Sequence, residues 1–244
     1  MSTRLLLMKL PFSADDLMNI TLDLARREEM RQDIYIRPLA YKAEKIIGVR
    51  LHDLRDEVTI YAVPFGRYIE SEEGAHVCTS SWRRVDDTSI PARGKLAGAY
   101  VNSAFIKSEA LMNGFDEAIV LNQDGHVSEG SAENIFIVRN RTLITPPVSD
   151  NILEGITRRT LIDLATTQLG LPVVERSIDR TELYVADEAF FCGTGVQVAA
   201  IASVDRRPVG SGKMGPITNE LRDLYFEVVR GNVPQYSDWC TPVF

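Results

Sequence analysis

Residues 81–102 read SWRRVDDTSIPARGKLAGAYVN, and between Gly94 and Val101 this stretch holds a single basic residue, Lys95. Small and apolar neighbours keep water away from an amine, which disfavours its charged form and lowers its pKa. A neutral amine is a nucleophile, and lysine is the usual Schiff-base partner of carbonyl compounds. The alternative is a surface lysine whose stem lies along small residues while its ammonium stays in water. Spacing alone favours this alternative, because most lysines are surface residues.

A second candidate for chemistry lies downstream, in the segment SEGSAEN at residues 128–134. Glu129 stands between Ser128 and Gly130, where the backbone can turn tightly. The alternative is an ordinary loop glutamate. Glu133 and Asn134, at the end of the same segment, are expected to serve the structure.

Two further segments could bind an anion through their backbones. The segment GITR at residues 155–158 precedes an apolar pattern of helical period, and a helix N-terminus directs its N–H groups at a phosphate. The segment GTG at residues 193–195 ends a predicted strand, where glycines let amides approach an anion and Thr194 adds a hydroxyl. Neither signal is specific, because most helix starts bind only water and many strands end in a plain turn.

Together these motifs resemble the class IV aminotransferases, and most closely the branched-chain amino acid aminotransferases. The resemblance rests on Ile90-Pro91 followed by Lys95, Gly98 and Tyr100, and on the SEGSAEN segment. It continues from about residue 4 to the C-terminus, so it does not depend on one motif. It implies an α/β enzyme of fold type IV that uses pyridoxal 5'-phosphate and needs no metal.

The resemblance also implies roles for individual residues. Lys95 forms the Schiff base with the cofactor and then moves a proton from the substrate Cα. Tyr100 contacts the phenolic oxygen of the cofactor, and Glu129 keeps the pyridine nitrogen protonated, so that the ring draws electrons from the substrate. The cofactor phosphate is assigned to three residues at the two backbone sites, Ile156, Thr157 and Thr194.

A substrate site is expected from a different part of the chain. Residues 33–39 read as an alternating strand, which places Tyr35 and Arg37 on one face. The alternative is a half-exposed strand with a solvated arginine, but the resemblance favours a role for the pair in the substrate carboxylate site. It also assigns Tyr68, Thr194 and the amide of Gly195 to substrate binding. At Gly195 the related enzymes usually have alanine, a mild departure for a backbone contact.

The implied reaction is the transfer of an amino group from leucine, isoleucine or valine to 2-oxoglutarate. Three alternatives share the fold: a D-amino acid transaminase, an (R)-amine transaminase and an aminodeoxychorismate lyase-like enzyme. The Tyr35-x-Arg37 pair argues against these. A further alternative is a truncated pyridoxal-phosphate-binding protein with little activity.

The resemblance implies two α/β domains. Residues 1–64 correspond to the remainder of a small N-terminal domain, residues 65–74 to the connection and residues 75–244 to a large cofactor-binding domain. Related enzymes begin well upstream of the point that matches Met1, so the small domain is expected to be incomplete. The upstream part carries a phosphate-binding arginine, whose loss would cost about 1.5–3 kcal/mol of cofactor affinity.

Composition excludes several classes of protein. The chain has 244 residues and a net charge of −7, with no long basic run, which argues against nucleic acid or a membrane surface as partner. Its longest apolar runs are too short to span a membrane. Three separated cysteines suggest a reducing, cytoplasmic compartment and no zinc site. A homodimer or higher homo-oligomer is expected from the resemblance, because active sites in the family borrow residues from a neighbouring subunit.

Local patterns predict the main elements. Ser13 followed by two aspartates predicts the start of a helix that ends near Arg27. Further helices are expected at residues 102–112, after Gly155 and after Gly215. Strands are expected at residues 33–39, 58–63, 118–121, 135–138 and 187–192, with a hairpin turn at residues 123–126.

Overall fold

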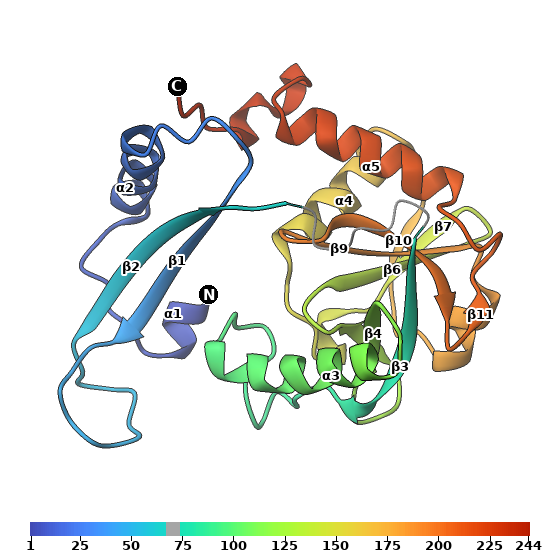
Figure 1. Cartoon of the computed structure of the whole chain (residues 1–244), viewed down its shortest axis with the longest axis horizontal. Helices are drawn as coiled ribbons and strands as arrows, with labels where there is room; N and C mark the ends of the chain where they lie inside the picture. Colours follow the sequence, from blue (N-terminus) through green and yellow to red (C-terminus); the bar gives the residue numbers. More distant parts are fainter. Residues whose placement is uncertain (67–73) are drawn as a thin grey trace. The chain divides into compact units, whose positions relative to one another are not determined.

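The computed structural model describes residues 1–66 and 74–244. The chain divides into two compact units, Met1–Arg67 together with Thr241–Phe244, and Tyr68–Cys240. Both units combine helices with strands (Figure 1), in agreement with the predicted α/β class. No helix in the described ranges is long and apolar enough to cross a membrane.

The first unit is a helix packed on a two-stranded antiparallel sheet. Helix α2 (Ala14–Arg27) begins at a capping box in which Ser13 and Asp16 each accept a hydrogen bond from the other's backbone N–H. It packs against β2 (Asp56–Pro64), which pairs with β1 (Ile34–Lys42). A short helix, α1 (Ser2–Leu5), precedes them and has no counterpart in the sequence prediction.

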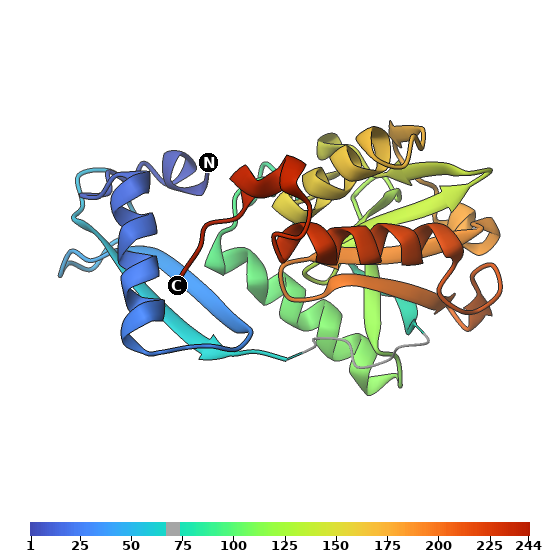
Figure 2. The same ribbon diagram turned by 90° about the horizontal axis from the view of Figure 1, so that it is seen from above.

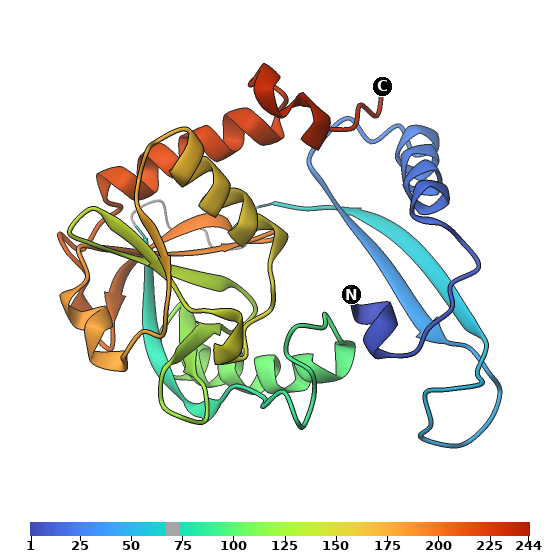
Figure 3. The ribbon, with the colours of Figure 1, turned by 180° about the vertical axis from the view of Figure 1, so that it is seen from behind.

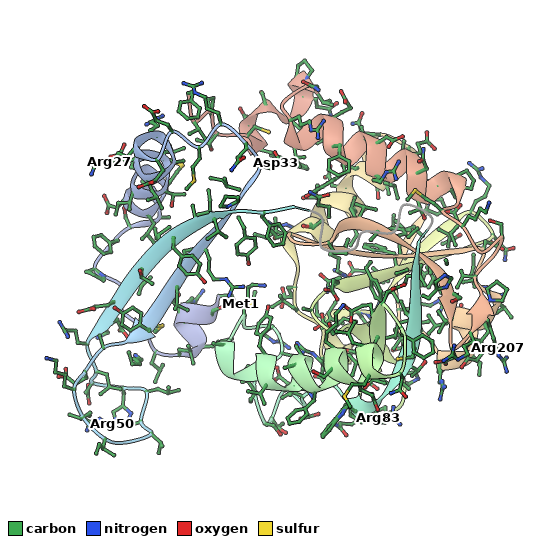
Figure 4. The ribbon with its side chains drawn as sticks, viewed as in Figure 1. Met1, Arg27, Asp33, Arg50, Arg83 and Arg207 are labelled. Carbon is green, nitrogen blue, oxygen red and sulfur yellow. The ribbon has the colours of Figure 1, made fainter. Side chains whose placement is uncertain are left out.

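The last four residues belong to the first unit. The Arg26 side chain donates from Nε to the carbonyl of Val243 at 2.5 Å, and the Arg31 guanidinium lies 4.2 Å from the centre of the Phe244 ring. Figure 4 labels Arg27 at the end of α2 and Asp33 immediately before β1. The Arg26 contact joins the C-terminus to α2, the helix whose start Ser13 predicts.

In the described part of the second unit, nine strands form one mixed sheet. Its order is β5-β4-β3-β10-β9-β6-β7-β8, with β11 beside β10. The strands are β3 (Ala75–Arg83), β4 (Glu117–Leu121), β5 (Val127–Gly130), β6 (Asn134–Arg139), β7 (Thr142–Thr145), β8 (Val173–Glu175), β9 (Glu188–Gly193), β10 (Gln197–Val204) and β11 (Arg207–Pro208). The pairs β3–β10, β3–β4 and β7–β8 are parallel and the others antiparallel.

Helices cover the sheet of this unit on both faces. Helices α4 (Ile156–Thr167) and α5 (Pro216–Val229) lie next to each other on β9 (Figure 2), while α3 (Tyr100–Met112) packs on β3 and β4. Figure 3 shows α3 on the side of the sheet opposite to α4 and α5. The described residues of this unit also include four short 3-10 helices: η1 (Ala97–Ala99), η2 (Val148–Asp150), η3 (Arg180–Val185) and η4 (Pro234–Trp239).

Strand β6 shows why the centre of the sheet is buried on both faces. Its consecutive residues Ile135 and Phe136 belong to different core clusters, and both side chains are fully buried. The Phe136 ring stacks on Phe190 of β9 at 5.1 Å beneath the helix layer. A strand buried on both faces has a continuous apolar run, and residues 135–138 form such a run.

Two central strands are absent from the sequence prediction. Strands β3 and β10 lie in the middle of the sheet; β3 has no continuous apolar run, whereas β10 contains the short apolar run at residues 198–202. Strand β3 carries His76, Thr79 and Ser80 among its apolar residues, and parallel pairing with β4 and β10 fixes its place. Long-range pairing therefore decides the place of β3.

Candidate active site

Lys95 and Tyr100 form a hydrogen-bonded pair at the start of α3. The loop after β3 delivers Lys95, and the single turn η1 then rotates the chain into α3, whose first residue is Tyr100. Lys95 Nζ donates to Tyr100 Oη at 2.8 Å. An amine that is held by a phenol is suited to bonding a carbonyl group and to moving a proton.

The prediction that small and apolar neighbours keep water away from Lys95 is wrong, because Lys95 is exposed among the described residues. Gly94, Ala97 and Gly98 around it are too small to cover a long side chain, and Leu96 is itself buried in the protein. Pocket geometry, and not burial by its neighbours in sequence, therefore distinguishes this lysine.

Glu129 is a buried carboxylate with donors on both oxygens. Its Oε1 pairs with Arg84 Nη2 at 2.8 Å, and its Oε2 accepts from Asn134 Nδ2 at 3.1 Å and from the Leu153 N–H at 3.0 Å. Burial raises the pKa of the Glu129 carboxyl, while the charges of Arg84 and Lys95 and the Leu153 N–H oppose that rise. A cation and two neutral donors thus favour the ionised form.

The N-terminus of α4 lies next to Glu129, whose Oε2 accepts from the Leu153 N–H just before this helix. Its N-cap is Gly155, which offers no side chain to bond the first N–H groups, and Thr157 in the first turn is buried. A Cβ on Gly155 would overlap Asn134 Oδ1, so only glycine lets the helix start approach Asn134 this closely. An uncapped helix start of this kind favours a bound anion.

These elements surround one pocket, with about 600 Å³ of space between atoms, part of it open to solvent. All six residues that the sequence predicts as cofactor-binding line it, namely Lys95, Tyr100, Glu129, Ile156, Thr157 and Thr194. The remaining wall is formed by Arg84, Gly94, Ala99, Ser103, Ser131, Ala132, Asn134, Leu153, Gly155, Cys192 and Gly193.

The predicted substrate residues lie in several places. Tyr35 and Arg37 share a face of β1 as expected, and Arg37 Nη2 donates to Tyr35 Oη at 3.1 Å. Gly195 lies in the turn between β9 and β10 and is not among the residues that line the pocket. Tyr68 lies outside the described residues.

Two pocket residues were missed as functional candidates. Arg84 stands in the quoted stretch but has no spacing signal of its own, and only the fold brings it to Glu129. Asn134 was assigned to structure, yet its amide contacts Glu129 directly. Asn134 stands in the same short segment as Glu129, and this proximity in the sequence could have indicated that the two side chains meet.

Among the described residues, no group of three or more His, Cys, Asp or Glu side chains could hold a metal ion. Pyridoxal phosphate, by contrast, carries an aldehyde, a ring oxygen, a basic ring nitrogen and a phosphate. The pocket presents an amine beside a phenol, a buried carboxylate and an uncapped helix start. Each part of the cofactor has a chemical counterpart, so the residues fit this group.

Comparison with known proteins identifies the family of the chain. Residues 1–204 match the family model described as Amino-transferase class IV. A probable branched-chain-amino-acid aminotransferase of Aquifex aeolicus is 49% identical over 243 residues, which are 100% of this chain and 78% of the relative.

Solved structures extend the likeness to the fold. A branched-chain aminotransferase of Thermoproteus uzoniensis with norvaline has a TM-score of 0.95 and 42% identity, over 100% of this chain and 80% of its own. A branched-chain amino acid aminotransferase of Thermobaculum terrenum in its PLP form has a TM-score of 0.95 and 44% identity, over 100% and 79% of the two chains. The predicted fold type IV is confirmed, and pyridoxal phosphate is the cofactor of this fold family.

The family match covers most of the chain, and the likeness in sequence and in structure spans all of it. The chain therefore belongs to the class IV aminotransferases, and within them to the branched-chain-amino-acid aminotransferases.

Proposed function

We propose that this chain transfers the amino group of L-leucine, L-isoleucine or L-valine to 2-oxoglutarate, with pyridoxal phosphate bound in the Lys95 pocket. The observation that carries the proposal is that Lys95, Tyr100, Glu129 and the N-terminus of α4 line one pocket. The names of the relatives support the branched-chain substrate class.

When bound, pyridoxal phosphate supplies a carbon that bonds to amines and a ring that draws electrons from the substrate Cα. The N–H groups of Ile156 and Thr157, together with Thr194, hold the phosphate. Glu129 holds the ring nitrogen, and Tyr100 holds the ring oxygen. These assignments follow the donor types on the pocket wall.

Lys95 both attaches the cofactor and moves a proton. With the cofactor bound, Nζ would attach it and would hold and move the proton of the substrate Cα. Tyr100 Oη, at 2.8 Å, orients this amine and accepts a hydrogen bond from it. General acid–base catalysis by a positioned group of this kind contributes about 10²–10⁴ in rate.

From the resemblance, Tyr35, Arg37, Tyr68, Thr194 and the Gly195 amide are assigned to the binding of substrate carboxylates. Support for the first two comes from β1, where Tyr61 of β2 pairs directly opposite Arg37. The hydrogen bond from Arg37 to Tyr35, with further contributions from Tyr35 and Tyr61, raises the pKa of the guanidinium. A fixed, charged guanidinium suits bidentate binding of a carboxylate.

The proposed assembly is a homodimer in the cytoplasm. Exposed apolar side chains on and beside α3 support association: the Trp82 ring stacks on Phe105 at 4.8 Å, and Val101 and Met112 are 61% and 86% exposed. Sedimentation velocity measures the oligomeric state.

The three cysteines are free thiols, which fits a reducing compartment.

The test is reconstitution with pyridoxal phosphate, borohydride reduction and peptide mapping, followed by an assay with L-leucine and 2-oxoglutarate. We expect the label on Lys95 and turnover of L-leucine. Lys95→Ala should abolish both, whereas Lys213→Ala, which removes an exposed lysine that does not line the pocket, should preserve both.

Two results would contradict the proposal. A label on another lysine would mean that the site is misplaced. Turnover of D-alanine without turnover of L-leucine would place the chain with the D-amino acid transaminases of the same fold.

A further inference from the structure

Arg84 and Glu129 form a buried ion pair on the wall of the pocket. Their side chains are 7% and 4% exposed, and Nη2 lies 2.8 Å from Oε1. An isolated charge would be costly in this position, so the guanidinium of Arg84 favours the ionised form of Glu129.

Hydrogen bonds from several elements hold Arg84, and they fix the position of its guanidinium group. Its backbone N–H donates to the carbonyl of Leu121 on β4 at 2.9 Å, and its own carbonyl accepts from Gln123 Nε2 at 3.2 Å. Its Nε donates to the carbonyl of Asn151 at 3.3 Å, just after η2. Figure 4 labels the preceding residue, Arg83, at the end of β3. The sheet and two loops therefore hold Arg84 against Glu129.

Charge is divided unevenly around the carboxylate. On Oε2 the donors are the neutral groups of Asn134 and Leu153, whereas Oε1 faces the guanidinium. The Lys95 charge also favours the ionised carboxylate, and burial raises the pKa of nearby Glu133 to about 8. Arg84 is the cation in direct contact, so it contributes most to keeping Glu129 ionised.

We propose that Arg84 is a positioning residue that keeps Glu129 as a carboxylate. The proton that Glu129 and the cofactor ring nitrogen could share then lies on the nitrogen. The inference rests on the proposed function. Moving the proton from Glu129 to the ring moves positive charge away from the guanidinium, which is electrostatically favourable. Without Arg84, the buried carboxyl would keep the proton and the ring nitrogen would be neutral.

An ion pair that served only stability would not control this proton. Breaking any buried pair destabilises a protein, so loss of activity or of stability alone does not separate the two roles. The test must therefore measure the protonation state of Glu129 and of the ring nitrogen.

The first experiment uses the cofactor-free protein and infrared spectroscopy. The C=O band of a protonated carboxylic acid is assigned to Glu129 by subtracting the spectrum of the matching Glu129→Gln protein, which also removes the contribution of Glu133. In the wild type, Glu129 should be ionised at pH 7. Arg84→Met should raise the pKa of Glu129 by about 1–3, and Arg84→Lys should remain close to the wild type.

Arg158→Met is the matched control, because it removes another buried guanidinium, one that pairs with Glu175 and not with Glu129. It should leave the Glu129 band unchanged. A protonated Glu129 in the wild type at pH 7 would overturn the proposal, and this measurement needs no Arg84 variant to fold. An unchanged pKa of Glu129 in folded Arg84→Met would overturn it as well.

The second experiment loads the proteins with pyridoxal phosphate labelled with ¹⁵N in the ring. The ¹⁵N chemical shift should report a protonated nitrogen in the wild type and in Arg84→Lys, and an unprotonated one in Arg84→Met. A protonated nitrogen in all three would overturn the proposal. If the wild type fails to bind the cofactor at Lys95, the proposed function fails, while the infrared result still decides whether Arg84 controls Glu129.

Discussion

Glu188 of β9 accepts hydrogen bonds from both the backbone N–H and the Oγ1 hydroxyl of Thr218, each at 2.7 Å. Its other oxygen accepts from the Ile217 N–H at 3.0 Å. The N-cap of α5 is Gly215, which has no side chain for this purpose, so a buried carboxylate from the sheet caps the helix. A Cβ on Gly215 would overlap the Glu188 side chain, which explains glycine at this position.

Removing this cap should destabilise the second unit. In Glu188→Ala, two helix N–H groups and a hydroxyl lose their buried acceptor, so we expect the free energy of unfolding to fall by about 2–3 kcal/mol. Urea denaturation followed by circular dichroism measures it. Glu220→Gln, an exposed change on the same helix, is the control and should have little effect. Equal stability of the two variants would show that water replaces the cap.

Gly155→Ala should weaken both the fold and cofactor binding. The added methyl group would overlap Asn134 Oδ1, and Asn134 in turn contacts Glu129. We expect a loss of about 1–3 kcal/mol in stability and a higher Kd for pyridoxal phosphate, measured by fluorescence titration. Gly98→Ala is the control, because no described atom lies within 4 Å of its Cβ. An unchanged Kd in folded Gly155→Ala would contradict this account of the pocket wall.

Glu133 should make stability fall as the pH rises. Burial, and then the negative charge of Glu117, raise the pKa of this carboxyl to about 8, well above its ordinary value. The folded protein therefore binds a proton that the unfolded chain has lost between about pH 5 and pH 8, and stability decreases across that window.

The Glu133→Gln variant tests this titration. Glutamine resembles the protonated acid, so the variant should match the wild type near pH 5 and exceed it by at least about 1 kcal/mol above pH 8. Thermal unfolding across this pH range provides the measurement. The exposed change Glu154→Gln should leave the profile unaltered. Parallel profiles for wild type and Glu133→Gln would mean that Glu133 is ionised throughout.

Tyr100→Phe should separate cofactor attachment from catalysis. The phenol is lost but Lys95 remains, so borohydride should still label Lys95 while kcat with L-leucine falls by about 10–100-fold. Tyr41→Phe removes an exposed hydroxyl that bonds to Glu57 and should leave kcat unchanged. An unaltered kcat in Tyr100→Phe would remove Tyr100 from the proposed proton path.

Arg37→Met should impair substrate binding. Without the guanidinium that bonds to Tyr35, we expect KM for the keto acid to rise about tenfold or more, and the label on Lys95 to persist. Steady-state kinetics measure this change, with exposed Arg50→Met as the control in the same unit. If KM stayed constant, Arg37 would have no part in carboxylate binding.

The sequence by itself determined much of the fold and most of the pocket. Local signals were sufficient for α2, whose capping box lies within four residues, and for β6, whose apolar run marks a strand buried on both faces. The residues that bear the chemistry, Lys95, Tyr100 and Glu129, stand in short motifs whose residue types carry the resemblance.

Only the tertiary structure decided the rest. Strand β3 gains its place from parallel pairing, which has no signature in the local sequence. The exposure of Lys95 depends on which distant residues reach it, and not on its small neighbours. The pairing of Arg84 with Glu129 joins residues 45 positions apart (129 − 84) through the order of the strands. Local patterns record backbone preference and burial, whereas the partner of a buried charge is fixed only when the sheet brings separate segments together.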